Sequence, residues 1–142
     1  MPVSAATDRR IDSRRKRPTV LLVEDNLDQL DLYALLLETS VDVLRASRGE
    51  AAYALACAER PDVIVLDLLL PDVSGFVISR RLRGTEATAK IPIIFLTGDE
   101  DSYFKALSSP EYAVVFDVLK KPCPAERLLS VIAAAAERRP ES

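Results

Sequence analysis

Four short apolar runs, separated by helical patterns, constrain the fold more than any other feature of this sequence. Residues 19–23, 62–66, 91–96 and 114–119 are rich in valine, isoleucine and leucine. Continuous apolar strands of this length are typical of a parallel sheet that is buried on both faces. A fifth run, 41–46, alternates between apolar and polar residues, which predicts a strand at the edge of that sheet.

Helical patterns occupy the intervals between these runs. Apolar residues recur at helical spacing over residues 27–37, and Asn26 is the predicted N-cap of that helix. Residues 50–59 are rich in alanine, a strong helix former, and Arg60-Pro61 is predicted to end this helix. Further helices are expected over 75–83, closed by Gly84 as the C′ residue, over 101–107 and over 124–138.

The alternation of strands and helices predicts one α/β domain. The 142 residues suit a single domain, and right-handed crossovers place helices on both faces of the sheet. We expect a doubly wound (βα)5 fold, with a five-stranded parallel sheet in the flavodoxin-like order 2-1-3-4-5. No apolar run approaches the roughly 18–20 residues that span a bilayer, and no secretory signal precedes the first strand. A cytoplasmic protein is therefore expected.

The net charge of −3 is the sum of two segments of opposite charge. Residues 1–17 hold six basic and two acidic side chains, a net charge of +4, whereas residues 18–142 hold 13 basic and 20 acidic side chains, a net charge of −7. We expect a disordered basic leader over 1–17, a folded domain over 18–138 and a C-terminal tail over 139–142. The basic cluster at 14–17 is compatible with nucleic acid or acidic lipid. A solubilising or back-folding leader is the favoured interpretation, so no nucleic-acid partner is expected.

Histidine is absent from the sequence, which excludes several kinds of catalytic chemistry. The chain has no Ser-His-Asp triad, no Cys-His pair, no imidazole ligand for a metal and no phosphohistidine of its own. The two cysteines, Cys57 and Cys123, are interpreted as buried, reduced side chains rather than a redox pair.

Chemically active side chains gather where the predicted strands end. Glu24 and Asp25 follow the first strand, Asp67 follows the third, Thr97 closes the fourth and Lys121 follows the fifth. Ligands of open α/β sheets bind beyond the carboxyl ends of the strands, at the switch point of the strand order. In the order 2-1-3-4-5 the first and third strands are neighbours, so we expect the three carboxylates to converge.

Three converging carboxylates repel one another, and a divalent cation removes that repulsion. Mg²⁺ prefers oxygen ligands and keeps several waters, so it suits an acidic pocket without histidine better than zinc does. A carboxylate in such a pocket can also attack phosphorus and form an aspartyl phosphate. Phosphoryl transfer needs mainly positioning and charge neutralisation, which Mg²⁺, the Lys121 ammonium and the Thr97 hydroxyl would provide together.

Taken jointly, several motifs resemble the receiver domain of bacterial two-component response regulators. They are residues 20–25 (Val-Leu-Leu-Val-Glu-Asp), 61–67 (Pro-Asp-Val-Ile-Val-Leu-Asp) with Pro71 and Gly75 behind them, 91–97 (Ile-Pro-Ile-Ile-Phe-Leu-Thr), and Lys121-Pro122. The resemblance covers residues 18–138, nearly the whole predicted domain. Because only a short tail follows, the chain looks like a stand-alone receiver similar to chemotaxis regulators.

The resemblance implies a role for each residue of the pocket. Asp67 would be the phosphoacceptor, and the ligands of Mg²⁺ would be Glu24, Asp25, Asp67 and the backbone carbonyl of Leu69. Thr97 would be the switch hydroxyl and Lys121 the phosphate-pairing lysine, whose bond to the following proline is usually cis in this family. The phosphoryl group would come from a sensor histidine kinase or a histidine phosphotransfer protein. The chain would signal through protein-protein contacts and would not be a turnover enzyme.

Three departures from the family pattern fall on the face formed by the fourth helix, the fifth strand and the fifth helix. Val118 stands where the family usually has tyrosine or phenylalanine, residues 108–113 replace the usual Gly-Ala-Asp-Asp, and Cys123 replaces an aromatic residue. Relatives signal to partners or dimerise through this face. The resemblance therefore leaves open the downstream target, a homodimer, and the coupling between Thr97 and this face.

Two other classes of function remain as alternatives. A degenerate receiver would act as a phosphorylation-independent binding module, although the complete acid-threonine-lysine set argues against it. An enzyme on a similar fold, such as a flavin carrier or a haloacid-type phosphatase, is disfavoured. Leu69 stands where that phosphatase needs a second aspartate, and acidic residues stand where a flavin phosphate loop would lie.

Overall fold

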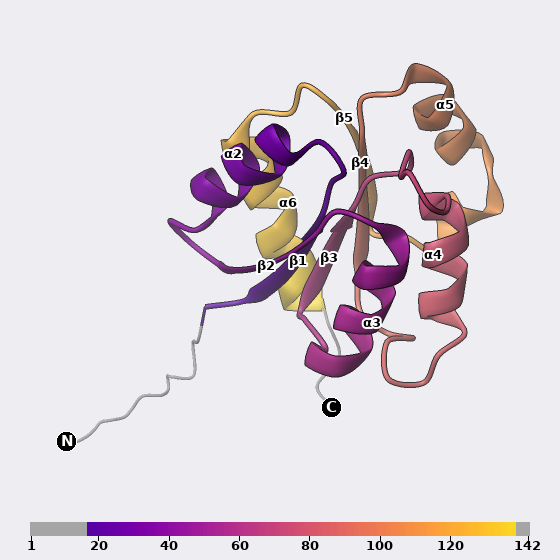
Figure 1. The fold of residues 1–142 in the computed structure, drawn as a ribbon, viewed down its shortest axis with the longest axis horizontal. Coiled ribbons are helices and arrows are strands. Elements are labelled where there is room, and N and C mark those ends of the chain that lie inside the picture. Colours follow the sequence, from indigo (N-terminus) through magenta and orange to yellow (C-terminus); the bar gives the residue numbers. More distant parts are fainter. Residues whose placement is uncertain (1–16, 139–142) are drawn as a thin grey trace.

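The computed structural model describes residues 17–138, which form a five-stranded sheet flanked by helices (Figure 1). The strands are β1 (Thr19–Val23), β2 (Asp42–Ala46), β3 (Val63–Leu66), β4 (Ile93–Thr97) and β5 (Asp117–Lys120). The helices are α2 (Leu27–Leu37), α3 (Gly49–Glu59), α4 (Gly75–Arg83), α5 (Glu100–Ser108) and α6 (Ala125–Arg138). A 3-10 turn, η1, spans Pro110–Ala113.

The five strands are parallel and lie in the order β2-β1-β3-β4-β5. This confirms the doubly wound, flavodoxin-like (βα)5 fold, and it confirms the edge strand predicted at 41–46. Val23, the last residue of β1, pairs with Ala46 of β2 on one side and with Leu66 of β3 on the other. The residues that follow β1 and β3 therefore leave the sheet side by side, at its carboxyl edge.

Helices cover both faces of the sheet, and each face has its own apolar core. α2 and α6 lie over one face, and α3, α4 and α5 lie over the other (Figure 1). Along β1, Val20 and Leu22 belong to the core under α2 and α6, whereas Leu21 and Val23 belong to the opposite core. All four side chains are at most 1% exposed. Burial on both faces explains why the strand is a continuous apolar run rather than an alternating one.

Local hydrogen bonds determine where the helices begin and end. Asn26 caps α2 as predicted, because its side chain accepts the backbone N–H of Gln29 at 3.0 Å. α3 ends at Arg60, which has a left-handed φ of 45° directly before Pro61. The prediction of Gly84 as a C′ residue was wrong by one position. Gly84 is the C-cap of α4, with a φ of −87°, and no left-handed glycine is needed to close this helix.

The fifth strand begins three residues later than predicted. Residues 114–116 lie outside β5. The backbone N–H groups of Val114 and Val115 both bond to the carbonyl of Glu111 at 3.0 Å, whereas that of Phe116 already bonds to the carbonyl of Ile93 in β4 at 2.7 Å. The bonds to Glu111 extend the 3-10 turn that Pro110 opens, and Val114 is 53% exposed rather than buried in the sheet. The apolar composition of this segment predicts a strand, but backbone hydrogen bonds to the preceding residues form a turn there.

The predicted leader and tail lie almost entirely outside the described residues, at positions 1–16 and 139–142. Arg17, which we assigned to the leader, contacts the domain. Its guanidinium donates to the backbone carbonyls of Glu38 and Val41 at 2.8 and 2.7 Å, and it pairs with Asp42 at 3.1 Å. Between residues 17 and 138, none of the helices is long and apolar enough to cross a membrane.

Candidate functional site

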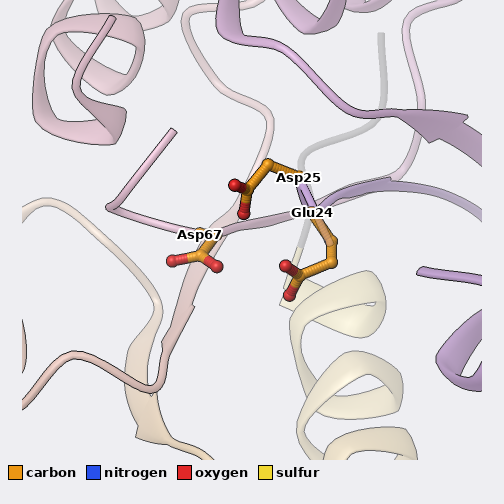
Figure 2. A group of neighbouring side chains, drawn as sticks. All are labelled: Glu24, Asp25 and Asp67. Atoms are coloured by element: carbon orange, nitrogen blue, oxygen red, sulfur yellow. The ribbon is translucent and has the colours of Figure 1, made fainter. Parts of the chain in front are cut away.

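Three carboxylates meet at the carboxyl edge of β1 and β3. Glu24 and Asp25 follow β1, Asp67 follows β3, and the two strands pair directly. Each side chain offers an oxygen that lies within 4.8 Å of the other two, and Figure 2 shows the group. Glu24 and Asp67 are buried, at 3% and 5% exposure, whereas Asp25 is exposed at the rim. The convergence predicted from the strand order is therefore confirmed.

Lys121 reaches this group from the loop that follows β5. Its ammonium donates to Asp67 Oδ2 at 3.1 Å, to Gln29 Oε1 at 2.9 Å and to Glu24 Oε1. Burial alone would lower the pKa of Lys121. The hydrogen bonds and charges of Glu24 and Asp67 outweigh burial and raise that pKa above its ordinary value. The side chain is thus held as an ammonium, and its peptide bond to Pro122 is cis, as the resemblance implied.

The balance of charge in the pocket suits a divalent cation. Burial raises the pKa of Glu24 above its ordinary value, although Lys121 and the backbone N–H of Asn26 partly offset this by donating hydrogen bonds to the carboxylate. In the described part of the chain, the pocket brings one ammonium against three carboxylates, so it is short of positive charge. Carboxylate oxygens are the ligands that a hard cation such as Mg²⁺ prefers. The donor set therefore fits the cation expected from the sequence.

Thr97 ends β4 beside the acidic group. It is fully buried, and it lines the same pocket as Asp67 and Lys121. Its Oγ1 accepts the backbone N–H of Asp99 at 3.2 Å, which ties the side chain to the start of α5. Its carbonyl accepts the backbone N–H of Lys121 at 2.9 Å. This backbone hydrogen bond holds the two residues that carry the predicted hydroxyl and the predicted ammonium side by side.

The loop after β3 packs tightly against the backbone of Asp67. The Leu69 N–H donates to Asp67 Oδ1 at 3.1 Å, and the Leu69 side chain is 58% exposed at the rim of the pocket. The Leu69 carbonyl as a metal ligand stays a prediction. Gly75 opens α4 against this loop, where a Cβ atom would lie 2.3 Å from the Asp67 carbonyl oxygen. Only glycine allows α4 to begin so close to the end of β3.

Sequence reasoning missed two residues of this region. Gln29, on the first turn of α2, accepts a hydrogen bond from Lys121, 92 positions away. Asp72, in the loop after β3, accepts the backbone N–H groups of Gly49 and Glu50 at 2.8 and 3.0 Å and so caps α3. Both contacts join segments that are distant in sequence, so no local spacing marks either residue.

The three departures from the family pattern lie beside the pocket rather than within it. Val118 is 5% exposed and packs in the core beneath α3, α4 and α5. Cys123 is buried, and its carbonyl accepts the hydroxyl of Tyr33 at 3.4 Å. Residues 108–113 end α5 and form η1, in which Glu111 pairs with Arg80 of α4 at 2.6 Å. Val118 and Cys123 are thus buried beneath the face of α5, β5 and α6, whereas residues 108–113 lie at the surface.

Comparisons with known proteins agree with this geometry. A family model described as "Response regulator receiver domain" matches residues 20–133. The chain is 34% identical over 116 residues to Protein PilH of Pseudomonas aeruginosa, a match that covers 81% of this chain and 94% of that protein. It is 36% identical over 124 residues to the DNA-binding dual master transcriptional regulator RpaA of a Synechocystis species. That match covers 85% of this chain and 50% of RpaA, so the chain spans half the length of this curated relative.

Solved structures show the same architecture. A response regulator receiver domain protein from Clostridium thermocellum superposes with a TM-score of 0.76 at 27% identity, over 85% of this chain and 95% of that one. The receiver domain of a Pseudomonas aeruginosa sensor histidine kinase gives a TM-score of 0.76 at 26% identity, over 86% of this chain and 99% of that one. The latter was solved with a magnesium ion coordinated in its active-site cleft.

Proposed function

The chain belongs to the response regulator receiver domain family, and on that premise we propose that it accepts a phosphoryl group on Asp67. The observation that carries the proposal is the placement of Asp67 at the end of β3. Its carboxylate is buried, lies 3.1 Å from the Lys121 ammonium, and shares the pocket with Glu24 and Asp25. The 142 residues contain no histidine, so the phosphohistidine of the donor lies outside this sequence.

Side chains of this protein supply the nucleophile of the transfer and neutralise charge on the phosphoryl group. A carboxylate oxygen of Asp67 attacks the phosphorus atom of the donor, and the leaving group departs from the opposite side. The Lys121 ammonium, already beside Asp67 Oδ2, pairs with one phosphoryl oxygen. The Thr97 hydroxyl lines the same pocket and donates to another. Each contact neutralises charge that develops on the phosphoryl oxygens during transfer.

Glu24, Asp25 and Asp67 would hold Mg²⁺, with the Leu69 backbone carbonyl as a further ligand. Their grouping within 4.8 Å supports this assignment, as does the magnesium in the related receiver of the Pseudomonas aeruginosa kinase. When bound, the cation supplies positive charge that orients and stabilises the transferring group. Lys121, which pairs with Asp67 at 3.1 Å, contributes further positive charge.

The phosphodonor is a sensor histidine kinase or a histidine phosphotransfer protein, in keeping with the family. The phosphoryl signal leaves through protein-protein contacts on the face of α5, β5 and α6, where a downstream target or a second copy would bind. The chain undergoes phosphorylation and dephosphorylation without turning over a substrate, and it acts in the cytoplasm.

A phosphorylation-independent binding module is the second candidate, and Val118 is the observation that favours it. In the family pattern an aromatic ring at this position swings inward when the threonine moves. A buried valine has no comparable movement, because its branched side chain is fixed in one packed rotamer. In that case the fold and the binding face of α5, β5 and α6 would be retained, but phosphorylation of Asp67 would not change the conformation of that face.

Intact-protein mass spectrometry after incubation with acetyl phosphate tests the proposal. We expect the wild-type chain to gain the mass of one phosphoryl group with Mg²⁺ present and far less of it with EDTA. The Asp67→Asn variant should gain none, although its fold is intact by circular dichroism. A wild-type chain that stays unmodified with both acetyl phosphate and kinase would refute the proposal and favour the binding module.

A further inference from the structure

The Lys121 ammonium has three N–H groups and donates them to three acceptors. Two of these acceptors, Glu24 and Asp67, already have a role in the proposed transfer, and the third, Gln29, has none. Glu24 and Asp67 are members of the acidic group, whereas Gln29 is neutral and comes from α2. Its Oε1 lies 2.9 Å from Lys121 Nζ, slightly closer than Asp67 Oδ2 at 3.1 Å. An ammonium has three donors and no acceptor, so all of its hydrogen bonds are satisfied in this arrangement.

The backbone of Gln29 is fixed by the start of α2. Its N–H donates to the side chain of Asn26 at 3.0 Å, and the next residue, Leu30, is 5% exposed in the core. The cap and the buried neighbour hold the first turn of the helix at the edge of the pocket. The amide group of Gln29 is therefore presented to Lys121 from a rigid position, although its own side chain is exposed.

In the proposed function, the Glu24 carboxylate has two partners, the cation and the Lys121 ammonium. As a ligand of the cation it would turn away from Lys121, and the ammonium would lose one of its acceptors. Gln29 would then remain as an acceptor for Lys121 together with Asp67. Its amide oxygen adds no net charge to a pocket that already contains three carboxylates. One N–H of Lys121 is left for an incoming phosphoryl oxygen.

We propose that Gln29 is a positioning residue that holds the Lys121 ammonium beside Asp67 during phosphoryl transfer. It acts through Lys121 and need not touch the phosphoryl group. The inference rests on the proposed function, since it concerns the rate of phosphorylation of Asp67. It assigns a role to a side chain in α2 that belongs neither to the acidic group nor to the threonine-lysine pair.

The test compares the full chain with a Gln29→Met variant, in which a side chain of similar length has no strong acceptor. Acetyl phosphate is the donor, and intact-protein mass spectrometry follows the labelled fraction at saturating Mg²⁺. We expect the maximal rate of phosphorylation to fall about five- to tenfold, which is the loss expected for a single hydrogen bond made by an exposed side chain. The half-saturating concentrations of Mg²⁺ and acetyl phosphate should stay within about twofold of the wild-type values, since neither is bound by Gln29.

Two further variants separate positioning from a structural effect. Gln29→Glu restores an acceptor of the same length but adds a negative charge to the pocket, so its maximal rate should lie between those of Gln29→Met and wild type. Leu35→Met changes a residue of α2 that is 66% exposed and outside the pocket, so its rate and melting temperature should equal those of wild type. The melting temperature of Gln29→Met should also stay within about 2 °C of wild type, because the residue is exposed.

A Gln29→Met chain with the wild-type maximal rate would overturn the inference while leaving the proposed function intact. A loss of rate that follows a matching fall in melting temperature would also overturn it, because Gln29 would then be a structural residue. A wild-type chain that takes no phosphoryl group would refute the proposed function itself, and this inference with it.

Discussion

Gly75 is the residue whose replacement tests most sharply how the fold positions Asp67. A Cβ atom at this position would lie 2.3 Å from the carbonyl oxygen of Asp67 and 2.7 Å from the Cα atom of Leu68. Both contacts are with backbone, which has no rotamer that could relieve them. Comfortable separations between such atoms are about 3.5–4.0 Å, so Gly75→Ala must push α4 and the end of β3 apart by roughly 1 Å.

The expected cost follows from two opposing effects. Overpacking of a well-packed region costs about 1–3 kcal/mol, and contacts with rigid backbone put Gly75→Ala at the upper end. Replacing glycine by alanine also restricts the unfolded chain, which returns about 0.4–1 kcal/mol. We therefore expect a net loss of about 2 kcal/mol, or a fall in melting temperature of roughly 8 °C for a domain of this size.

Thermal and urea unfolding, followed by circular dichroism, measure this loss, and Gly84→Ala is the matched control. Gly84 has a φ of −87°, and a Cβ atom there would lie 3.5 Å from the nearest atom, the carbonyl oxygen of Arg80. This substitution should be neutral or slightly stabilising. In the acetyl phosphate assay, Gly75→Ala should also be labelled more slowly than Gly84→Ala, because the displaced backbone carries Asp67. Equal stabilities of the two variants would refute the close approach of α4 to Asp67.

Two further predictions concern the loop after β3 and the face of α5, β5 and α6. The backbone N–H groups of Glu50 and Gly49 donate to the Asp72 carboxylate and hold its pKa below the ordinary value. The ionised carboxylate therefore stabilises the fold at any pH above the unfolded-state pKa. This contribution is lost as the pH falls through the lower folded-state pKa. Asp72→Ala should therefore lower the melting temperature most at neutral pH and least in acid; a difference that grows in acid would contradict the capping role. Binding of beryllofluoride should shift the amide resonances of Thr97 and of α5; shifts confined to the acidic pocket would mean that Val118 leaves the outer face uncoupled.

The sequence predicts the pocket well because the fold itself assembles it. Glu24 and Asp67 each follow a continuous apolar run, and the strand order alone makes those runs neighbours. Thr97 and Lys121 likewise mark strand ends at the same edge. Residues that owe their position to regular strands are therefore accessible to reasoning from pattern and topology.

Features that depend on individual hydrogen bonds between distant segments were not accessible in this way. Gln29 resembles any polar residue at a helix start until the fold brings Lys121 against it. Asp72 looks like an ordinary loop residue, although it caps a helix 23 positions earlier in the chain. In each case the deciding interaction is set by tertiary packing rather than by local sequence.

The site of phosphorylation is the central claim, and chemical mapping tests it most directly. Borohydride reduces an aspartyl phosphate to homoserine, which marks the modified position permanently. After treatment with acetyl phosphate and Mg²⁺ and then with borohydride, peptide mass spectrometry should find homoserine at position 67. Homoserine at Asp25, or at no position despite a gain of phosphoryl mass, would contradict the assignment of Asp67 as the phosphoacceptor.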